Sequence, residues 1–422
     1  MEMMRIRGGK RLEGVIPIHG AKNSALPLLA ATLLVPGVST LHNCPRLSDV
    51  SASQAILRHV GCRVTQEEDR VTVDATTLSR DEIPDDLMRQ MRSSIVFLGA
   101  MVARCGAAAM TYPGGCELGP RPIDLHLAAL RRLGVQVEEH HGTIRCTAPK
   151  GLQGAEITLS FPSVGATENV LLAACTATGT TVLRGAAREP EIVDLCRFLN
   201  TCGARITGAQ SGTMVIEGVP DLHPATHRVM PDRIEAATYL AAAAVTGGDV
   251  ILTRCDLEAP APVFPALEQA GCRLCRLGED TLRIVGPERP GRMGVVRTMP
   301  YPGFPTDGAA PLVALACTAS GTAVFVETIF ENRYRYVDEL TRMGARIRVD
   351  GRVAVVEGVP RLQGAPVACT DLRGGAALVV AALAAAGEST ITHLDHLDRG
   401  YENLEGCLRA VGADVVRHPS PI

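Results

Sequence analysis

The chain has 422 residues, of which 46% are hydrophobic and 21% are charged, and it contains no tryptophan. This length predicts two or three domains whose cores are built from Ala, Val, Leu and Ile rather than from aromatic residues. The net charge of −3 excludes the broad basic surface of a nucleic-acid-binding protein, so we expect no nucleic-acid partner.

The first fourteen residues, MEMMRIRGGKRLEG, lack the apolar stretch of a signal peptide. The longest runs of small apolar residues, 236–245 and 374–387, are too short for a membrane span. We therefore expect a soluble, cytoplasmic protein without a membrane partner. In that compartment the 14 cysteines are expected to be free thiols.

Two kinds of helix alternate along the chain. Segments rich in Ala and Leu predict the first kind, at 20–34, 91–103, 164–177, 232–245, 306–319 and 372–386. Each of these is followed by a Gly-containing turn and a strand, such as 180–187 or 322–329. The second kind of helix ends at a glycine and leads into alternating apolar residues. These glycines recur every 68–73 residues, at Gly61, Gly134, Gly203, Gly271, Gly344 and Gly412.

One repeat thus consists of helix, strand, helix, strand and strand. Six such repeats predict an α/β fold with two domains of three repeats each.

Charged residues recur at corresponding helix starts. Four of the first helices begin near a cation, at Lys22, Arg92, Arg233 and Arg373, and a fifth begins near Asp307. Four of the second helices follow an arginine, at Arg121, Arg188, Arg333 and Arg399. If the repeats surround an axis, their helix N-termini converge and form an anion site. The alternative is a set of ordinary solvated or salt-bridged side chains.

The segment TYPGGCELGPRPIDLH places Cys116 on a loop dense in Gly and Pro, ahead of Arg121 and a helix start. A nearby guanidinium and a helix N-terminus both favour a reactive thiolate. The alternative is an idle cysteine on a surface turn.

Metal sites are disfavoured. Cys272 and Cys275 lie in an expected strand, where the two thiols would face opposite ways. His393 and His396 are read as a polar turn before a helix rather than as zinc ligands. The known nucleotide-binding glycine motifs do not occur. The residues alone therefore predict a two-domain enzyme that binds small polyanions, with no metal and no cofactor.

Nine motifs, in order and from end to end, resemble the enolpyruvyl transferases: GAKNSALP, PGGCELGPRPIDLH, SVGATEN, AAREPEIVDL, PDRIEAATYL, FPTD, TIFENRY, DLRGGAA and LDRGYE. The resemblance implies an inside-out α/β barrel in each domain, a threefold repeat with helices inside a ring of sheets. One domain would comprise residues 22–230, and the other residues 1–21 with 231–422.

The resemblance also implies an activity. The matching branch of the family transfers enolpyruvyl from phosphoenolpyruvate to the 3′-hydroxyl of UDP-N-acetylglucosamine and releases phosphate. This is the first committed step of peptidoglycan precursor synthesis, and fosfomycin blocks it by alkylating the cysteine that matches Cys116.

Site residues carry over motif by motif. Those that match the phosphoenolpyruvate cradle are Lys22, Arg121 and Arg399, supported by Arg92, Arg333 and Arg373. Asn23 and Asp307 match sugar contacts, with Asp307 as the base, and Cys116 matches an acid that also aids product release. Those that match the uridine-diphosphate contacts are Arg121, Pro122, Ile123, Asp124, Leu125, Ser163, Val164 and Gly165, with Ile329 as a further sugar-nucleotide contact.

The chain departs from the family pattern at two places. Many relatives carry Lys before SVGAT, where this chain has Phe161 and Pro162, and many carry Met and Gln after FPTD, where it has Gly308 and Ala309. Two other functions compete with the one implied: 5-enolpyruvylshikimate-3-phosphate synthase, and a catalytically silent paralogue that binds UDP-sugar.

Overall fold

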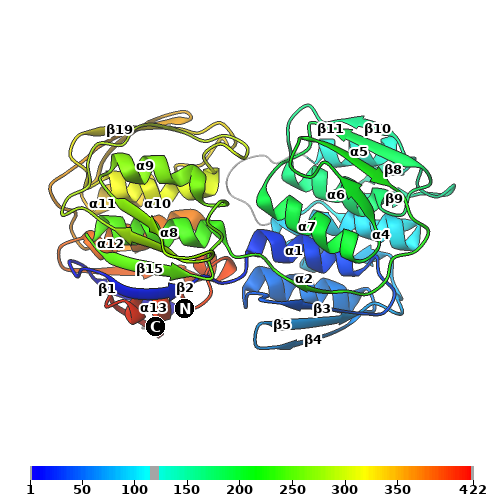
Figure 1. The fold of residues 1–422 in the computed structure, drawn as a ribbon, viewed down its shortest axis with the longest axis horizontal. Helices are drawn as coiled ribbons and strands as arrows, with labels where there is room; N and C mark the ends of the chain where they lie inside the picture. Colours follow the sequence, from blue (N-terminus) through cyan, green and yellow to red (C-terminus); the bar gives the residue numbers. More distant parts are fainter. Residues whose placement is uncertain (1, 115–122, 420–422) are drawn as a thin grey trace. The chain divides into compact units, whose positions relative to one another are not determined.

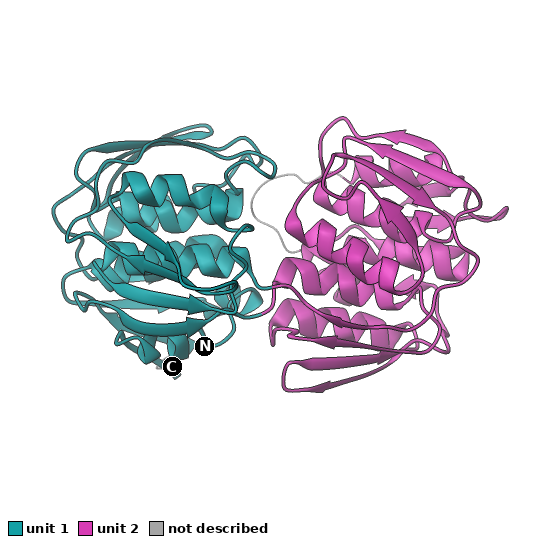
Figure 2. Ribbon diagram, in the orientation of Figure 1, with its two compact units in different colours: residues 1–19, 117–119, 231–422 teal, residues 20–116, 120–230 magenta. Residues whose placement is uncertain are grey.

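The computed structural model describes residues 2–114 and 123–419 and shows a mixed α/β chain (Figure 1). The chain divides into two compact units (Figure 2). The first, termed unit 1, contains the residues up to His19 and from Pro231 onward; unit 2 contains Gly20 to Met230 apart from the loop outside the described residues. Each unit has its own hydrophobic core.

Unit 2 contains three four-stranded sheets around its helices. The helices are α1 (Lys22–Thr32), α2 (Ser48–His59), α3 (Asp85–Met88), η1 (Arg92–Val96), α4 (Phe97–Cys105), α5 (Asp124–Arg132), α6 (Val164–Ala174) and α7 (Pro190–Thr201). The first sheet has the strand order β14 (Thr226–Arg228), β3 (Val38–His42), β5 (Arg70–Asp74), β4 (Arg63–Glu67). The second has the order β6 (Glu82–Ile83), β7 (Ala107–Thr111), β9 (Thr143–Thr147), β8 (Gln136–His140). The third has the order β10 (Glu156–Thr158), β11 (Thr180–Arg184), β13 (Thr213–Glu217), β12 (Arg205–Thr207).

Unit 1 repeats this plan. Its helices are α8 (Arg233–Val245), η2 (Ala261–Val263), α9 (Phe264–Gln269), α10 (Thr306–Ala316), α11 (Val337–Arg342), α12 (Leu372–Ala384), η3 (Leu394–Arg399) and α13 (Leu404–Ala410). Its first sheet has the strand order β16 (Arg273–Arg276), β17 (Leu282–Val285), β15 (Asp249–Thr253), β2 (Glu13–Pro17). The second has the order β18 (Gly294–Arg297), β19 (Thr322–Val326), β21 (Val353–Glu357), β20 (Arg346–Asp350). The third has the order β22 (Pro366–Ala368), β23 (Glu388–Thr392), β1 (Glu2–Arg7), β24 (Asp414–Pro419).

Every sheet combines one parallel pair with antiparallel pairs, as in β10 beside β11 and then β13 beside β12. The parallel edge strand is an addition to the predicted repeat of helix, strand, helix, strand and strand. Several of these edge strands, including β6, β10 and β22, have only two or three residues. Such short segments are below the length at which alternation of apolar and polar residues becomes visible.

The Ala-rich helices lie inside. All 13 residues of α8 are buried, and α8, α10 and α12 pack against one another in unit 1. A helix that is apolar on every side is stable only when it is surrounded by other elements. The sheets cover these helices with one face, so their strands alternate between buried and more accessible residues, as in β5 and β21.

The predicted helix ends are confirmed by the backbone. All six repeat glycines have positive φ, from 89° at Gly271 and Gly344 to 113° at Gly61. This is the left-handed region in which glycine ends a helix without strain. Among the described helices, none combines the length and the hydrophobicity that a membrane span requires.

Candidate active site

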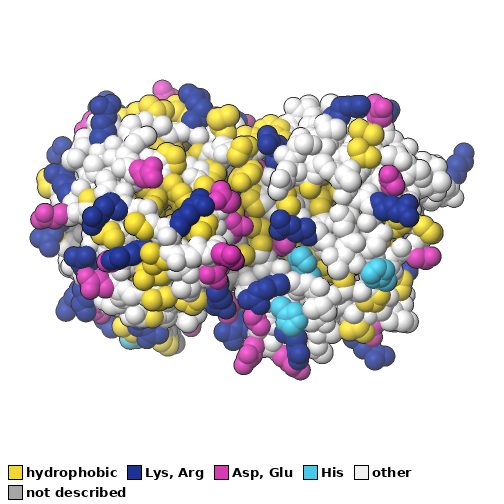
Figure 3. Space-filling model, viewed as in Figure 1, with side chains coloured by type: hydrophobic (Ala, Val, Ile, Leu, Met, Phe, Trp, Pro, Cys, Tyr) yellow, Lys and Arg dark blue, Asp and Glu magenta, His cyan; other side chains and the backbone are white. Residues whose placement is uncertain are grey.

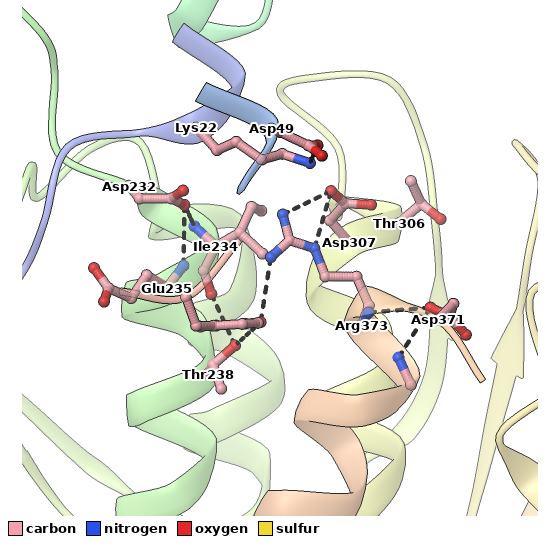
Figure 4. Close-up of polar contacts among 12 residues, drawn as sticks. Lys22, Asp49, Asp232, Ile234, Glu235, Thr238, Thr306, Asp307, Asp371 and Arg373 are labelled. Carbon is pink, nitrogen blue, oxygen red and sulfur yellow. Dashed lines mark hydrogen bonds and ion pairs between the residues drawn. The ribbon is translucent and has the colours of Figure 1, made fainter. Parts of the chain in front are cut away.

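Asp307 lies at the start of α10 and binds two arginines of unit 1, of which Figure 4 shows Arg373. Arg333 Nη2 donates to Asp307 Oδ1 at 2.8 Å. Arg373 donates to Asp307 Oδ2 through Nε at 3.2 Å and through Nη2 at 3.1 Å. Two guanidinium groups on one carboxylate favour its ionised form, which is the form that can accept a proton.

Asp307 does not occupy the N-cap position of its own helix. Pro305 occupies the N-cap position of α10, and no side chain caps it. In the corresponding helices of the same unit, Asp232 caps α8 and Asp371 caps α12, each by accepting two backbone N–H bonds. The Asp307 carboxylate instead binds Arg333 of its own repeat and Arg373 of the next repeat, whereas the other two aspartates cap their own helices.

Both arginines are almost completely buried, with side chains 2% and 3% exposed for Arg333 and Arg373, while the Asp307 side chain is 26% exposed. Burial lowers the pKa of Arg373, but the charge of Asp307 and the contact with Tyr401 outweigh it and raise the pKa overall. Arg333 Nε is buried without a hydrogen-bond partner among the described residues. The cluster thus combines a partly accessible carboxylate with fixed positive charge.

Lys22 begins α1 in unit 2, and Asn23 follows it. Lys22 Nζ lies 3.2 Å from Asp49 Oδ2 of α2, and their side chains are 12% and 2% exposed. This ion pair holds the ammonium group at the helix start, where the predicted anion site requires a cation.

Arg92 begins η1 and donates from Nη1 to the carbonyl oxygen of Pro113 at 2.9 Å. Pro113 lies just ahead of the predicted reactive loop. Three residues predicted on that loop, Cys116, Arg121 and Pro122, lie outside the described residues, so their predicted roles stay predictions.

The predicted uridine-diphosphate contacts fall on two helix starts of unit 2. Ile123 is the N-cap of α5, followed by Asp124 and Leu125 in its first turn. Ser163 is the N-cap of α6, and its side chain accepts from Ala166 N at 3.3 Å. Val164 and Gly165 begin the first turn of α6, and the first N–H groups of a helix have no partner within the helix, as an anion site requires.

His126 and Asn169, to which the sequence assigns no role, join these two helix starts. Asn169 Nδ2 lies 2.9 Å from His126 Nδ1 and donates to Ile95 O, while Asn169 Oδ1 accepts from Gly99 N at 2.6 Å. A Cβ on Gly165 would lie 2.8 Å from His126 Cε1, so any larger residue there would have to displace the buried imidazole.

Burial and then the charge of Arg92 lower the pKa of His126 to about 4. The imidazole is therefore neutral at pH 7 and packs as a fixed part of the site. The sequence gives no signal for this, because the burial of one histidine is not visible in a helical pattern.

Three further predicted residues lie in unit 1 outside the Asp307 cluster. Ile329 follows β19, and its N–H donates to Glu327 Oε1 at 2.7 Å. Arg399 ends η3, so His393 to Arg399 form a 3₁₀ helix and its cap rather than a simple turn. Arg233 lies over the Tyr301 ring, 5.7 Å from its centroid.

The two departures from the family pattern have different surroundings. Phe161 is exposed just before α6. A Cβ on Gly308 would lie 3.3 Å from Pro305 Cγ and 3.5 Å from Val263 Cγ1. Glycine thus allows the first turn of α10 to pack closely.

Within the described ranges, no three His, Cys, Asp or Glu side chains form a group that could hold a metal ion. Cys272 is buried and Cys275 is exposed, as expected for thiols on opposite faces. On the face viewed in Figure 3, basic and acidic side chains are interspersed.

Comparison with known proteins gives consistent results. The family model described as EPSP synthase (3-phosphoshikimate 1-carboxyvinyltransferase) matches residues 6–408. The chain is 52% identical over 417 residues to UDP-N-acetylglucosamine 1-carboxyvinyltransferase 2 of Caldanaerobacter subterraneus subsp. tengcongensis, covering 99% of this chain and 100% of the relative. It is 49% identical to UDP-N-acetylglucosamine 1-carboxyvinyltransferase 1 of Symbiobacterium thermophilum, covering 98% of this chain and 94% of the relative.

Among solved structures, the enolpyruvyl transferase NikO from Streptomyces tendae matches with a TM-score of 0.88 at 29% identity, covering 100% of this chain and 99% of NikO. EPSP synthase from Acinetobacter baumannii matches with a TM-score of 0.77 at 18% identity, covering 99% of this chain and 100% of that structure. At this level of identity the match shows a common fold alone. These likenesses confirm the predicted fold class.

Proposed function

This chain belongs to the enolpyruvyl transferase family, and we propose that it transfers the enolpyruvyl group of phosphoenolpyruvate to the 3′-hydroxyl of UDP-N-acetylglucosamine with release of phosphate. The observation that carries the proposal is the Asp307 carboxylate held by Arg333 and Arg373 at a helix start. Such a site supplies both a base for a hydroxyl group and cations for an anionic substrate.

The choice of acceptor is supported by the relatives. Those at 44–52% identity over nearly the full chain are named for UDP-N-acetylglucosamine. The shikimate alternative has support from the family description and from the fold of distant structures. A silent paralogue is disfavoured, because Lys22 and Asp307 occupy organised ion-pair sites.

In the proposed reaction, C3 of phosphoenolpyruvate gains a proton, so C2 becomes electrophilic. Asp307 accepts the proton of the 3′-hydroxyl as the sugar oxygen bonds to C2 and forms a tetrahedral phosphate ketal. The ketal then loses a C3 proton and phosphate, which leaves the enolpyruvyl ether. Fixed cations offset the repulsion between the substrate anions without reorganising during the reaction.

We assign the roles as follows. Lys22, Arg121 and Arg399 bind phosphoenolpyruvate, with support from Arg92, Arg333 and Arg373. The helix starts at Ile123–Leu125 and Ser163–Gly165, with Arg121 and Pro122, bind the uridine diphosphate, while Asn23 and Ile329 contact the sugar nucleotide. Cys116 is the proposed acid and product-release residue. No metal or cofactor takes part in this scheme.

The proposal includes a place in metabolism. Phosphoenolpyruvate and nucleotide sugars are cytoplasmic metabolites, so the reaction would run in the cytoplasm. Its product would be the first committed precursor of peptidoglycan.

Phosphate release with each acceptor tests the proposal. We expect phosphate from phosphoenolpyruvate when UDP-N-acetylglucosamine is added, with no loss of rate in EDTA. Release only with shikimate 3-phosphate would establish the alternative acceptor. No release with either acceptor, together with retained UDP-sugar binding, would indicate a silent paralogue.

A further inference from the structure

A line of hydroxyl groups lies behind Arg373, on the side away from Asp307 (Figure 4). Arg373 Nη1 lies 3.2 Å from the hydroxyl oxygen of Tyr401, and that oxygen lies 2.9 Å from Thr238 Oγ1. Thr238 Oγ1 lies 3.0 Å from the carbonyl oxygen of Ile234, one turn earlier in α8. All these groups are buried.

The chemistry of the groups fixes the direction of every bond in this line. A guanidinium group only donates, so Arg373 donates to the Tyr401 oxygen. The Tyr401 proton must then go to Thr238, which is its other hydrogen-bond partner in the structure. Thr238 has one proton, and it goes to the Ile234 carbonyl, which only accepts. The line ends at the backbone of α8, a rigid element of the core.

The guanidinium of Arg373 is therefore held from two sides. Its Nε and Nη2 bind Asp307, its Nη1 binds Tyr401, and its Cζ lies 5.5 Å from the centre of the Tyr401 ring. Since Asp307, Arg373 and Thr238 lie on α10, α12 and α8, the line connects the three central helices of unit 1.

We infer that Tyr401 is a positioning residue for the reaction, which anchors Arg373 to α8 and thereby sets the orientation of the Asp307 carboxylate. The inference rests on the proposed function only for the role given to Asp307. Tyr401 itself touches no reacting group in this assignment, because Arg373 lies between it and Asp307.

Replacing Tyr401 with Phe keeps the ring and removes the hydroxyl. A buried Arg373 donor then loses its acceptor, a loss that typically corresponds to about a tenfold change in an equilibrium or rate. We expect Tyr401→Phe to lower kcat about tenfold, with little change in the KM for UDP-N-acetylglucosamine. Thr238→Val removes the acceptor of the Tyr401 proton, one bond further from Arg373, and should lower kcat less than Tyr401→Phe. Thr238→Ser keeps a hydroxyl group at this position and should have a kcat close to that of the wild type.

Tyr336→Phe is the matched control. Tyr336 is also a fully buried tyrosine of unit 1, and its hydroxyl has no hydrogen-bond partner among the described residues. We expect wild-type kcat from this variant. A loss of kcat as large as that of Tyr401→Phe would show that any buried tyrosine hydroxyl matters and would overturn the inference.

The double variant Tyr401→Phe/Arg373→Lys tests whether Tyr401 acts through Arg373. If it does, the Tyr401 change has little further effect once the guanidinium is gone. If the double variant instead lowered kcat by the product of the two single effects, the two residues would act independently and the inference would be contradicted.

An NMR measurement separates this inference from the proposed function. The Nε–H signal of Arg373, assigned by its loss in Arg373→Lys, reports the bond to Asp307 without any substrate. We expect this signal to shift or exchange faster in Tyr401→Phe and to stay unchanged in Tyr336→Phe. An unchanged signal in Tyr401→Phe would overturn the inference, whereas a wild-type enzyme without phosphate release would overturn only the proposed function.

Discussion

At Asp307, the direct partners of the carboxylate determine what a substitution should do. Asn keeps the shape of the side chain but accepts no proton, and removal of a general base typically lowers the rate by about 10²–10⁴-fold. We expect Asp307→Asn to lower kcat by this order while UDP-N-acetylglucosamine still binds. Steady-state kinetics and calorimetric binding check both parts.

A structural role for Asp307 gives a different result. If Asp307 served only as a salt-bridge partner of Arg333 and Arg373, Asp307→Asn would lower the thermal stability and leave kcat close to wild type. A near-wild-type kcat would therefore exclude Asp307 as the base.

His126 makes the stability of the protein depend on pH. Its pKa of about 4 in the folded state lies below the ordinary value of 6.5, so below pH 6.5 the unfolded chain binds a proton that the folded protein does not. The His126 contribution to stability is therefore lost as pH falls from 6.5 toward 4, by about 2 kcal/mol between pH 7 and pH 5. Urea unfolding of the wild type and of His126→Gln at both pH values isolates this contribution: relative to the variant, the wild type should lose about 2 kcal/mol of unfolding free energy between pH 7 and pH 5.

The control for this prediction is His140→Gln, since the His140 side chain is exposed on β8. That variant should keep the pH dependence of the wild type. An equal loss of stability at pH 5 in His126→Gln would show that His126 is not the group responsible.

Cys116 is expected to be the reactive thiol. Ten of the 13 cysteines among the described residues are buried, and burial raises the pKa of Cys62 to about 12 and that of Cys146 to about 11, which disfavours the thiolate. We expect fosfomycin to inactivate the enzyme through one adduct on Cys116, found by peptide mapping. Cys116→Asp should stay active and become resistant.

Cys275→Ser is the matched control for fosfomycin, because Cys275 is exposed and lies on β16. This variant should remain as sensitive as the wild type. An adduct on Cys275, or sensitivity that persists in Cys116→Asp, would show that another thiol reacts.

At the scale of elements, the N-caps place the charged side chains. Asp371 Oδ1 accepts from Arg373 N and Gly374 N, both at 3.0 Å, so it holds the first turn of α12. Asp371→Ala should lower the free energy of unfolding by about 1 kcal/mol, measured by urea denaturation. Asp371→Asn, which keeps an acceptor, should lower it less; equal losses would mean that the cap bonds contribute little.

The elements also show what a sequence can reveal. The six helix ends are predictable because glycine at positive φ and the alternation that follows are local signals. The convergence of Arg373 and Asp307 is predictable only in outline, from their corresponding places in two repeats. The pairing of Asp307 with Arg333 and with Arg373, and the link from Arg373 to Tyr401, depend on side-chain contacts across 26 to 66 residues of sequence and have no local signal.

At the scale of the whole molecule, the two units differ in how the chain builds them. Unit 2 is made from the single stretch 20–230 and has its own core, whereas unit 1 needs β1 and β2 from the start of the chain. We expect a fragment of residues 20–230 to unfold cooperatively by circular dichroism. A fragment of residues 231–422 should not, because two of its sheets would each lack a strand. Cooperative unfolding of the second fragment would contradict this.

The pairing of β1 with β24 also has a consequence for synthesis on the ribosome. Glu2 to Arg7 pair with Pro419 to Asp414, so β1 leaves the exit tunnel long before β24, which completes its sheet. Unit 2 can meanwhile fold as soon as it emerges, while the early strands remain unpaired beside it. Slowing translation late in the message would prolong this state, in which exposed strand edges are open to chaperones and to aggregation.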